Sequence, residues 1–104
     1  MAAASTPTQT TRLPNYPNPF NPETWMPYQL RVSTDVRIRI HDVSGQLVRR
    51  LVIGARGAGD YLCRSKAAYW DGRNDTGESV GSGVYWYSID AGGYQETRKM
   101  VIQR

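Results

Sequence analysis

Apolar and polar residues alternate with a period of two from Met26 onward, and turn-forming residues interrupt the pattern about every 8 to 15 positions. In 36–41, three aliphatic residues alternate with Arg37, Arg39 and His41, which predicts a strand with one buried and one exposed face. Further strands are predicted over 26–32, 46–53, 61–70, 84–89 and 94–102, and no segment has the periodicity of a helix. The chain is therefore expected to form an all-β, two-sheet antiparallel sandwich of about six strands.

Two short connections are predicted to be hairpin turns. Ser44 and Gly45 are expected at the centre of a two-residue turn, because glycine adopts the positive φ that such a turn requires. Residues 90–93 are expected to join the last two strands, which places the end of the chain in a sheet. The strand over 84–89 offers apolar residues on both faces, so its phase stays open. Aliphatic pairs at 47–48 and 51–52 break the alternation in a way that a β-bulge would explain.

Four prolines between residues 13 and 22 fix the backbone and remove amide donors, so this segment is expected along the outside or the end of the domain. A short seventh strand could form within it. Residues 1–12 are rich in Ser, Thr and Pro, which is typical of a linker. The predicted organisation is a linker over 1–12 and one domain over 13–104, which ends a longer polypeptide with another domain upstream.

The composition limits the classes of function. A chain of 104 residues with 39% hydrophobic content fits one domain. Its apolar runs are far shorter than the roughly 20 residues of a transmembrane helix, so no transmembrane segment is expected, and its start does not resemble a signal peptide. The single cysteine, Cys63, cannot form an intramolecular disulfide, so the fold is expected to depend on packing.

The net charge is +4, and only Lys66 and Lys99 among the 13 basic residues are lysine. Four arginines, Arg37, Arg39, Arg49 and Arg50, could form a stripe that attracts phosphate-bearing surfaces, although a charged, solvated strand face is the commoner reason for such a pattern. The basic residues are too dispersed to predict nucleic-acid binding.

Residues that carry chemistry are few. His41 is expected on the exposed face of its strand, and Cys63 is expected to pack beside Tyr61 and Ala67 on a strand face. No catalytic triad and no zinc-ligand pair is present, so neither an enzyme nor a cofactor is predicted. The three tryptophans are expected mainly in the core, and a carbohydrate-binding surface is the weakest alternative.

One loop contains several oxygen ligands of the kind that calcium prefers. They are Asp71, Asn74, Asp75 and Glu78. Their spacing differs from that of an EF-hand loop, so no metal is predicted and calcium stays a weak alternative. An Asx turn at Asp71, with Gly77 in a left-handed conformation, is the preferred interpretation.

Five motifs follow one another in a recognisable order. They are Pro17-Asn18-Pro19-Phe20-Asn21-Pro22, the run from Ile40 to Val48, Trp70-Asp71-Gly72-Arg73, Ser82-Gly83-Val84-Tyr85, and Arg98-Lys99-Met100-Val101-Ile102. This series resembles the type A C-terminal sorting domains of proteins that the bacterial type IX secretion system exports. It is equally similar to the Ig-like domain of the flagellar hook-capping protein.

The resemblance implies an Ig-like β-sandwich that ends a secreted or cell-surface protein. It also implies a non-catalytic sorting signal that the outer-membrane secretion machinery recognises and a sortase-like peptidase removes. The recognition surface would comprise the last strand, Lys99-Met100-Val101-Ile102, and its partner region, Gly83-Val84-Tyr85. Recognition is expected through the edge of that strand, whose amides and carbonyls a partner strand can complete. A structural or adhesive Ig-like module is the alternative.

Overall fold

The computed structural model describes residues 14–20 and 23–103, so the predicted linker over 1–12 lies outside the described residues. Its strands are β1 (Thr24–Met26), β2 (Tyr28–Leu30), β3 (Thr34–Asp42), β4 (Leu47–Arg56), β5 (Gly59–Tyr61), β6 (Ala68–Trp70), β7 (Gly83–Ala91) and β8 (Tyr94–Ile102). All strand pairs are antiparallel, and no helix occurs in the described residues, so the all-β prediction is confirmed. None of these residues therefore forms a helix long and apolar enough to cross a membrane.

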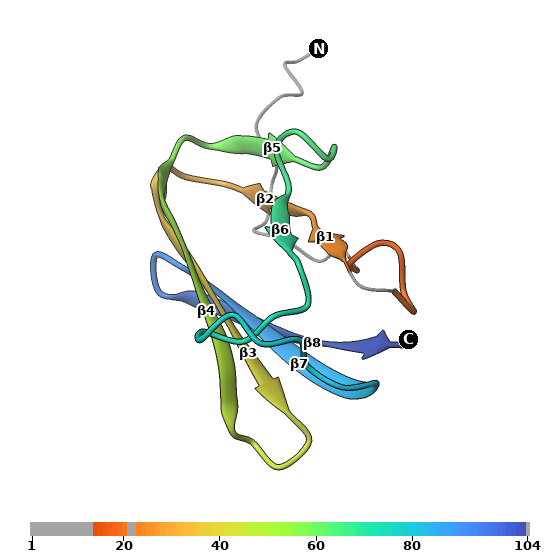
Figure 1. The fold of residues 1–104 in the computed structure, drawn as a ribbon. Helices are drawn as coiled ribbons and strands as arrows, with labels where there is room; N and C mark the ends of the chain where they lie inside the picture. The colour runs from red at the N-terminus through yellow and green to blue at the C-terminus, as the bar shows by residue number, and fades with distance from the viewer. Residues whose placement is uncertain (1–13, 21–22, 104) are drawn as a thin grey trace.

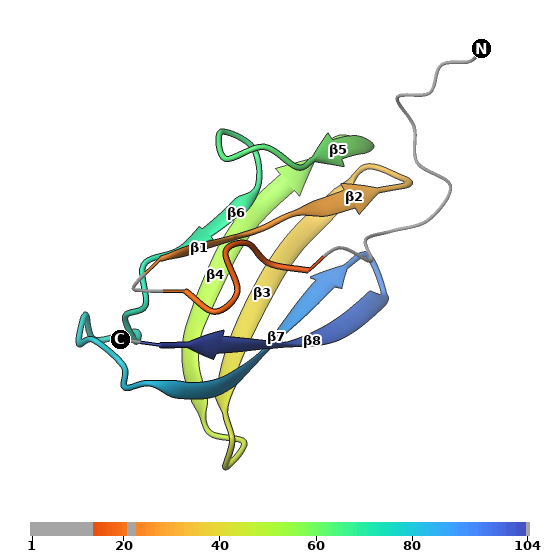
Figure 2. The ribbon, with the colours of Figure 1, turned by 90° about the vertical axis from the view of Figure 1, so that its right-hand side faces the viewer.

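The strands form two layers (Figures 1 and 2). One layer is a four-stranded sheet in the order β4-β3-β7-β8. The other consists of two ribbons, β1-β6 and β2-β5. The arrangement is a sandwich-like Ig fold, as predicted, and the proline segment 14–20 lies between β1 and β8 (Figure 2).

The number of strands is eight, and not six or seven, because two of the predicted strands are divided. The predicted strand 26–32 is interrupted by Pro27, which has no amide to donate to a ladder. Its halves pair with different partners, β1 with β6 and β2 with β5. The predicted strand 61–70 contains a turn in which the amides of Lys66 and Ala67 donate to the carbonyl of Cys63.

The core lies between the layers and confirms the alternation in β3. Val36, Ile38 and Ile40 are buried, and each such side chain stabilises the fold by about 1.5–3 kcal/mol relative to an exposed one. The structure also resolves the phase of β7, whose inner face carries Tyr85, Tyr87, Ile89 and Ala91. Burial raises the pKa of Tyr87 to about 12.

The β3–β4 hairpin forms as predicted, but its turn is longer than two residues. The amide of Gly45 donates to the carbonyl of Asp42, which makes Val43 and Ser44 the central residues. Gly45 follows them with a φ of 87°, so Ser44-Gly45 is not the centre of the turn. The carboxylate of Asp42 accepts the amides of Ser44 and Gln46 and fixes this geometry.

Two β-bulges in β4 confirm the expected break in alternation. The register shifts between Ile40 and His41 and between Val36 and Arg37. Val48 and Ile53 are the additional residues on the β4 side, and both pack against the core. The bulges therefore bring Val48, Leu51 and Ile53 against the core, while Val52 is exposed on the outer face.

The β7–β8 hairpin also forms, with Gly92 and Gly93 alone as its turn, so Asp90 and Ala91 belong to β7 and not to the connection. Both glycines have positive φ, 59° and 87°. At Gly92 a Cβ atom would lie 2.5 Å from Oγ1 of Thr34. No side chain is therefore tolerated at Gly92 without movement of Thr34.

Gly45 and Gly92 both have positive φ, but only Gly92 has a neighbour where a Cβ atom would lie, so alanine is expected to destabilise the fold unequally at the two positions. Gly45→Ala adds only the cost of a left-handed alanine, about 1–2 kcal/mol, because nothing lies within 4 Å of the new Cβ. Gly92→Ala adds the collision with Thr34 and is expected to lower the free energy of unfolding further, as urea titration measures. Thr34→Ala should recover part of the loss in Gly92→Ala and none in Gly45→Ala. Equal losses in the two glycine variants would contradict the close approach.

Candidate interaction surface

The predicted recognition residues lie side by side at one end of the four-stranded sheet. Gly83, Val84 and Tyr85 pair with Ile102, Val101 and Met100, respectively. The side chains of Tyr85, Met100 and Ile102 point into the core, with at most 8% of their surface exposed. Only the side chains of Lys99, Val84 and Val101 are left for direct contact with a partner. The other three predicted side chains belong to the core.

The outer edge of β8 is not uniform. The proline segment occupies its last residues, since Phe20 donates its amide to the carbonyl of Val101 at 3.0 Å and Gln103 donates its amide to the carbonyl of Phe20 at 2.9 Å. Asn18 completes the contact, because its side-chain Oδ1 accepts the Val101 amide at 3.0 Å. The predicted open edge is therefore closed at Val101.

Towards the hairpin the same edge is open. Backbone groups of alternate residues point to the same side of a strand, so Gln95, Thr97 and Lys99 direct their amides and carbonyls outward as Val101 does. In the described part of the chain, no other strand pairs with them. The open segment of β8, defined as Gln95 to Lys99, thus offers three amide donors and three carbonyl acceptors.

The middle of the other edge of the four-stranded sheet is covered by the loop after β6. Asp75 donates its amide to the carbonyl of Val48 and accepts the amide of Arg50 with its carboxylate, both at 3.0 Å. Arg49 adds ion pairs of 3.6 Å to both Asp71 and Asp75. The loop therefore covers the edge of β4 at its middle, and the hydrogen bonds and ion pairs of Asp71 and Asp75 hold the loop in this position.

The motif residues far apart in the sequence meet around Trp70. Phe20 packs edge-on against Trp70 with ring centroids 5.8 Å apart, and Tyr85 packs edge-on against Trp70 at 5.9 Å. Trp70 donates its indole N–H to the carbonyl of Arg73 at 2.8 Å. The amide of Val80 donates to the carbonyl of Gly72. The motifs of the described residues therefore build and close one end of the core, while Asn21 and Pro22 lie outside the described residues.

The calcium-type residues do not converge on a common point. Asp71 accepts the Arg73 amide in the predicted Asx turn, and Asn74 uses its oxygen for the amides of Thr76 and Glu78. Gly77 has the expected left-handed conformation, with a φ of 89°. No group of three or more metal-binding side chains of the His, Cys, Asp and Glu types occurs in the described residues. The side chains serve the loop and the β4 edge.

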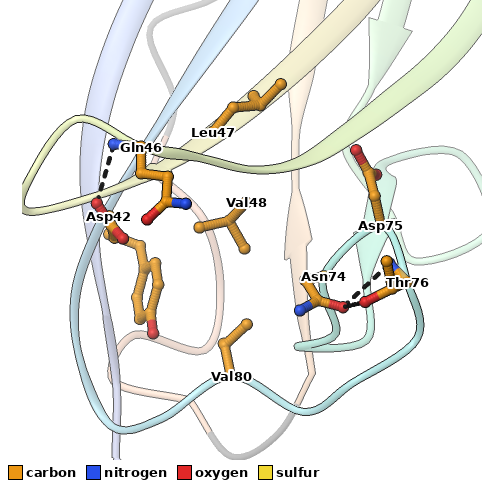
Figure 3. A pocket seen from close by; sticks show the side chains of 9 residues that line it. Asp42, Gln46, Leu47, Val48, Asn74, Asp75, Thr76 and Val80 are labelled. Carbon is orange, nitrogen blue, oxygen red and sulfur yellow. Dashed lines mark hydrogen bonds between the residues drawn. The ribbon is translucent and has the colours of Figure 1, made fainter.

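A cavity of about 340 Å³ lies between the β3–β4 turn and this loop (Figure 3). Val48 and Val80 point into the space between its two walls, and Asp42 bonds to Gln46 on one wall while Asn74 bonds to Thr76 on the other. The Ser44 hydroxyl and the Gln46 amide hold the pKa of the Asp42 carboxyl below its usual range. The Asp42 carboxylate and the Asn74 side-chain oxygen are thus committed to the turns that form the walls of the cavity.

Two sequence predictions about single side chains are wrong. Cys63 is exposed in the turn between β5 and β6, and not packed on a strand, because 62–67 does not continue the ladder. The Ser65 hydroxyl, 3.1 Å from its sulfur, lowers the pKa of the thiol. Trp86 is 40% exposed on the outer face of the sheet, whereas Trp70 is in the core as expected.

Trp25 is half-buried on the outer face of the β1-β6 ribbon. Its ring lies 5.4 Å from that of Tyr69 and 6.4 Å from that of Tyr16. The guanidinium of Arg64 lies 4.2 Å from its ring centroid, a cation–π contact. Arg64 therefore occupies a face of Trp25 that a sugar ring would need.

Of the three residues that direct backbone groups outward in the open segment, sequence reasoning identified Lys99 and missed Gln95 and Thr97. Gln95 and Thr97 lie on the polar face of a predicted strand, a signal for exposure but not for an unpaired edge. The role of Asn18 was equally hidden, because its contact with Val101 spans 83 residues of sequence.

Comparisons with known proteins identify relatives of this domain. The profile of a family described as the FlgD Ig-like domain matches residues 21–94. Among solved structures, dimeric latent PorU from Porphyromonas gingivalis is similar with a TM-score of 0.64 and 20% identity, over 86% of this chain and 9% of PorU. FlgD from P. aeruginosa has a TM-score of 0.54 and 24% identity, over 70% of this chain and 54% of FlgD. A search of curated proteins gave no match.

PorZ from Porphyromonas gingivalis, described as an essential surface component of the type IX secretion system, has a TM-score of 0.56 and 18% identity. The similarity covers 88% of this chain and 11% of PorZ. The chain thus spans only a small part of PorU and PorZ and about half of FlgD. At these identities the structures establish a shared Ig-like fold, and both resemblances noted in the sequence are supported.

We call the hydrogen bonds of Asn18 and Phe20 with residues 101–103 the clamp. Its Asn18 contact yields a stability prediction. Asn18→Ala removes the acceptor of the Val101 amide and is expected to lower the free energy of unfolding by about 1 kcal/mol, the net value of one hydrogen bond. Asn18→Asp keeps an oxygen at that position and should retain most of the stability. Urea titration of the three proteins checks this, and equal stability of Asn18→Ala and the unmodified chain would contradict the clamp.

Proposed function

The chain belongs to the FlgD Ig-like domain family, and on that premise we propose that it is a non-catalytic sorting domain of a secreted protein, recognised by the type IX secretion machinery. The observation that carries the proposal is the open segment of β8. Its amides and carbonyls, which pair with no other strand among residues 14–20 and 23–103, are what an extended strand of a partner protein completes, with one donor and one acceptor at each of Gln95, Thr97 and Lys99.

Two features support this segment over the rest of the surface. The middle of β4, at the other edge of the sheet, is covered by the loop through Asp75, and β8 beyond Lys99 is covered by the proline segment. A strand added to β8 would therefore stop at Val101, which would fix its register. Recognition by this means requires no chemistry within the domain.

Similarity to PorU and PorZ supports the type IX context, because PorZ is itself a surface component of that system. The proposed location is therefore the cell surface or the exterior, reached through the periplasm and the outer membrane. The proposed partners are the outer-membrane machinery, an upstream cargo domain of the same polypeptide and a sortase-like peptidase. The peptidase would cut in the segment 1–12, outside the described residues.

A structural or adhesive module is the second candidate, and the family match itself favours it. FlgD carries a domain of this fold. In that role the open segment would join neighbouring subunits and would not be read by an export apparatus.

Proline substitutions at the two edges test the sorting role. Thr97→Pro removes an outward amide and places a ring on the open segment, whereas Val52→Pro makes the same change at an outward position of β4. With the full chain fused behind an exported reporter in a type IX-competent host, we expect secretion of the parent and of Val52→Pro, and cellular retention of Thr97→Pro. Circular dichroism and thermal melting of the purified domains confirm that each variant folds.

Thr97→Val provides a further control, because it removes the hydroxyl that contacts Ser88 at 2.9 Å and keeps the amide. It should be secreted like the parent. Deleting 99–104 is a poorer test, since it also removes the buried side chains of Met100 and Ile102. Equal secretion of Thr97→Pro and Val52→Pro would exclude the open segment as the signal and leave the structural role.

A further inference from the structure

The outer face of the four-stranded sheet concentrates exposed basic residues around one exposed aromatic ring. Arg39 on β3, Arg50 on β4 and Lys99 on β8 are exposed, and Trp86 on β7 is 40% exposed. Trp86 lies directly opposite His41 on one side and Lys99 on the other. We call this group of Arg39, Arg50, Trp86 and Lys99 the basic face.

Arg39 and Arg50 are direct cross-strand partners. Like charges in such a pair repel each other and destabilise a sheet. Among residues 14–20 and 23–103, neither guanidinium forms an ion pair, whereas the neighbouring Arg49 has Asp71 and Asp75. The pair therefore places two like charges on neighbouring strands, and a carboxylate bound to both would relieve their repulsion.

Asp75 lies beside Arg50 at the β4 edge, where its carboxylate accepts the Arg50 amide and pairs with the Arg49 guanidinium. Two other acidic residues of this sheet surface lie away from Arg39 and Arg50. Asp90 is the direct partner of Arg37, and Asp35 precedes Arg37 by two positions on the same face of β3. Both lie towards the β7–β8 hairpin, where their negative charges offset the positive charge of Arg37. The charge of the surface is thus segregated, and the positive end is the end that carries Trp86.

We propose that the basic face docks an acidic segment of a partner protein, with carboxylates on Arg39 and Arg50 and an apolar or aromatic side chain on Trp86. Arginine forks bind carboxylates with two parallel hydrogen bonds, and tryptophan and arginine are the residues most enriched at the energetic centres of protein interfaces. A nucleic-acid site would need several stacking rings and more cations along the strand.

Continuity with the open segment of β8 also favours a protein as the occupant. Lys99 contributes its side chain to the basic face and its backbone to the open segment. One polypeptide can contact both, whereas a nucleic acid or a lipid headgroup cannot add to a β-ladder. The inference goes beyond the sorting role and holds equally for a structural module.

The experiment measures binding of fluorescein-labelled peptides to the full chain by fluorescence anisotropy at low ionic strength. The probe is a ten-residue peptide of alternating Glu and Thr, and its control carries Gln in place of Glu. We expect the Glu peptide to bind more tightly, and the double variant Arg39→Gln/Arg50→Gln to lose about 5- to 10-fold in affinity, as two exposed ion pairs provide. Arg31→Gln/Lys66→Gln removes the same charge from exposed positions elsewhere and should bind like the parent.

Thermal melting gives a second readout that does not depend on the peptide. Because the double variant removes a repulsive pair, its Tm at low salt should exceed that of the parent, with a gain that shrinks as salt is added. Equal binding of the Glu and Gln peptides, or equal affinities of the two double variants, would overturn the proposal. Binding of a dT12 oligonucleotide or of phosphatidylglycerol vesicles that depends on Arg39 and Arg50, without binding of the Glu peptide, would overturn the choice of a protein partner.

Discussion

The contact between the proline segment and the last strand is the constraint on which the rest of the structure depends. Tyr16 exchanges two 2.8 Å main-chain hydrogen bonds with Trp25 of β1, and Phe20 forms two more with Val101 and Gln103 at the end of β8. One short segment thereby joins the two layers of the sandwich. Because its prolines donate no amides, it can pair only at the positions between them. Phe20, which directly follows Pro19, supplies a buried ring to the core.

This contact also determines which part of the surface is available. A sheet edge that stays open is a liability for a protein that must not aggregate, and most edges are covered or charged. Here the middle of β4 is covered by a loop and the end of β8 by the proline segment, and among the described residues no strand pairs with the outer edge of β8 between the β7–β8 hairpin and Lys99. Lys99 discourages pairing with a second copy of the same edge and favours a partner of opposite charge. The open segment and the neighbouring basic face would thus both suit an extended, acidic segment of a partner protein.

The alternation of side chains predicted the four long strands well, because a two-residue period is a local property and a buried face enforces it. Val36, Ile38 and Ile40 are buried as expected, and both hairpins exist. The β3–β4 turn lies one residue earlier than predicted, because the Asp42 side chain accepts the Ser44 and Gln46 amides, which neither the period nor the glycine content reveals. The β7–β8 turn is shorter than predicted, because Asp90 and Ala91 continue β7. The short strands were merged for a related reason, since a three-residue ribbon has too little sequence to show a period.

The candidate surface was predictable only in part. Lys99 was correctly placed on the candidate surface. The closure of the β8 edge at Val101 depends on Asn18 and Phe20, and sequence periodicity contains no information on contacts between residues so far apart in the chain. The misplacement of Cys63 has the same origin, because the ladder that would have buried it ends at Tyr61. Arg39 and Arg50 were recognised as part of a stripe, but only the register of β3 against β4 distinguishes this repulsive pair from Arg49.

Amide hydrogen exchange of the unmodified chain reports on the closed and the open part of the β8 edge together, since it reads each backbone donor separately. We expect slow exchange at Val101 and Gln103, whose amides the proline segment accepts, and fast exchange at Gln95, Thr97 and Lys99. Fast exchange at Val101 and Gln103 would show that the clamp does not hold in solution. Slow exchange at Thr97 and Lys99 would show that the edge is already occupied, and either result would contradict the account.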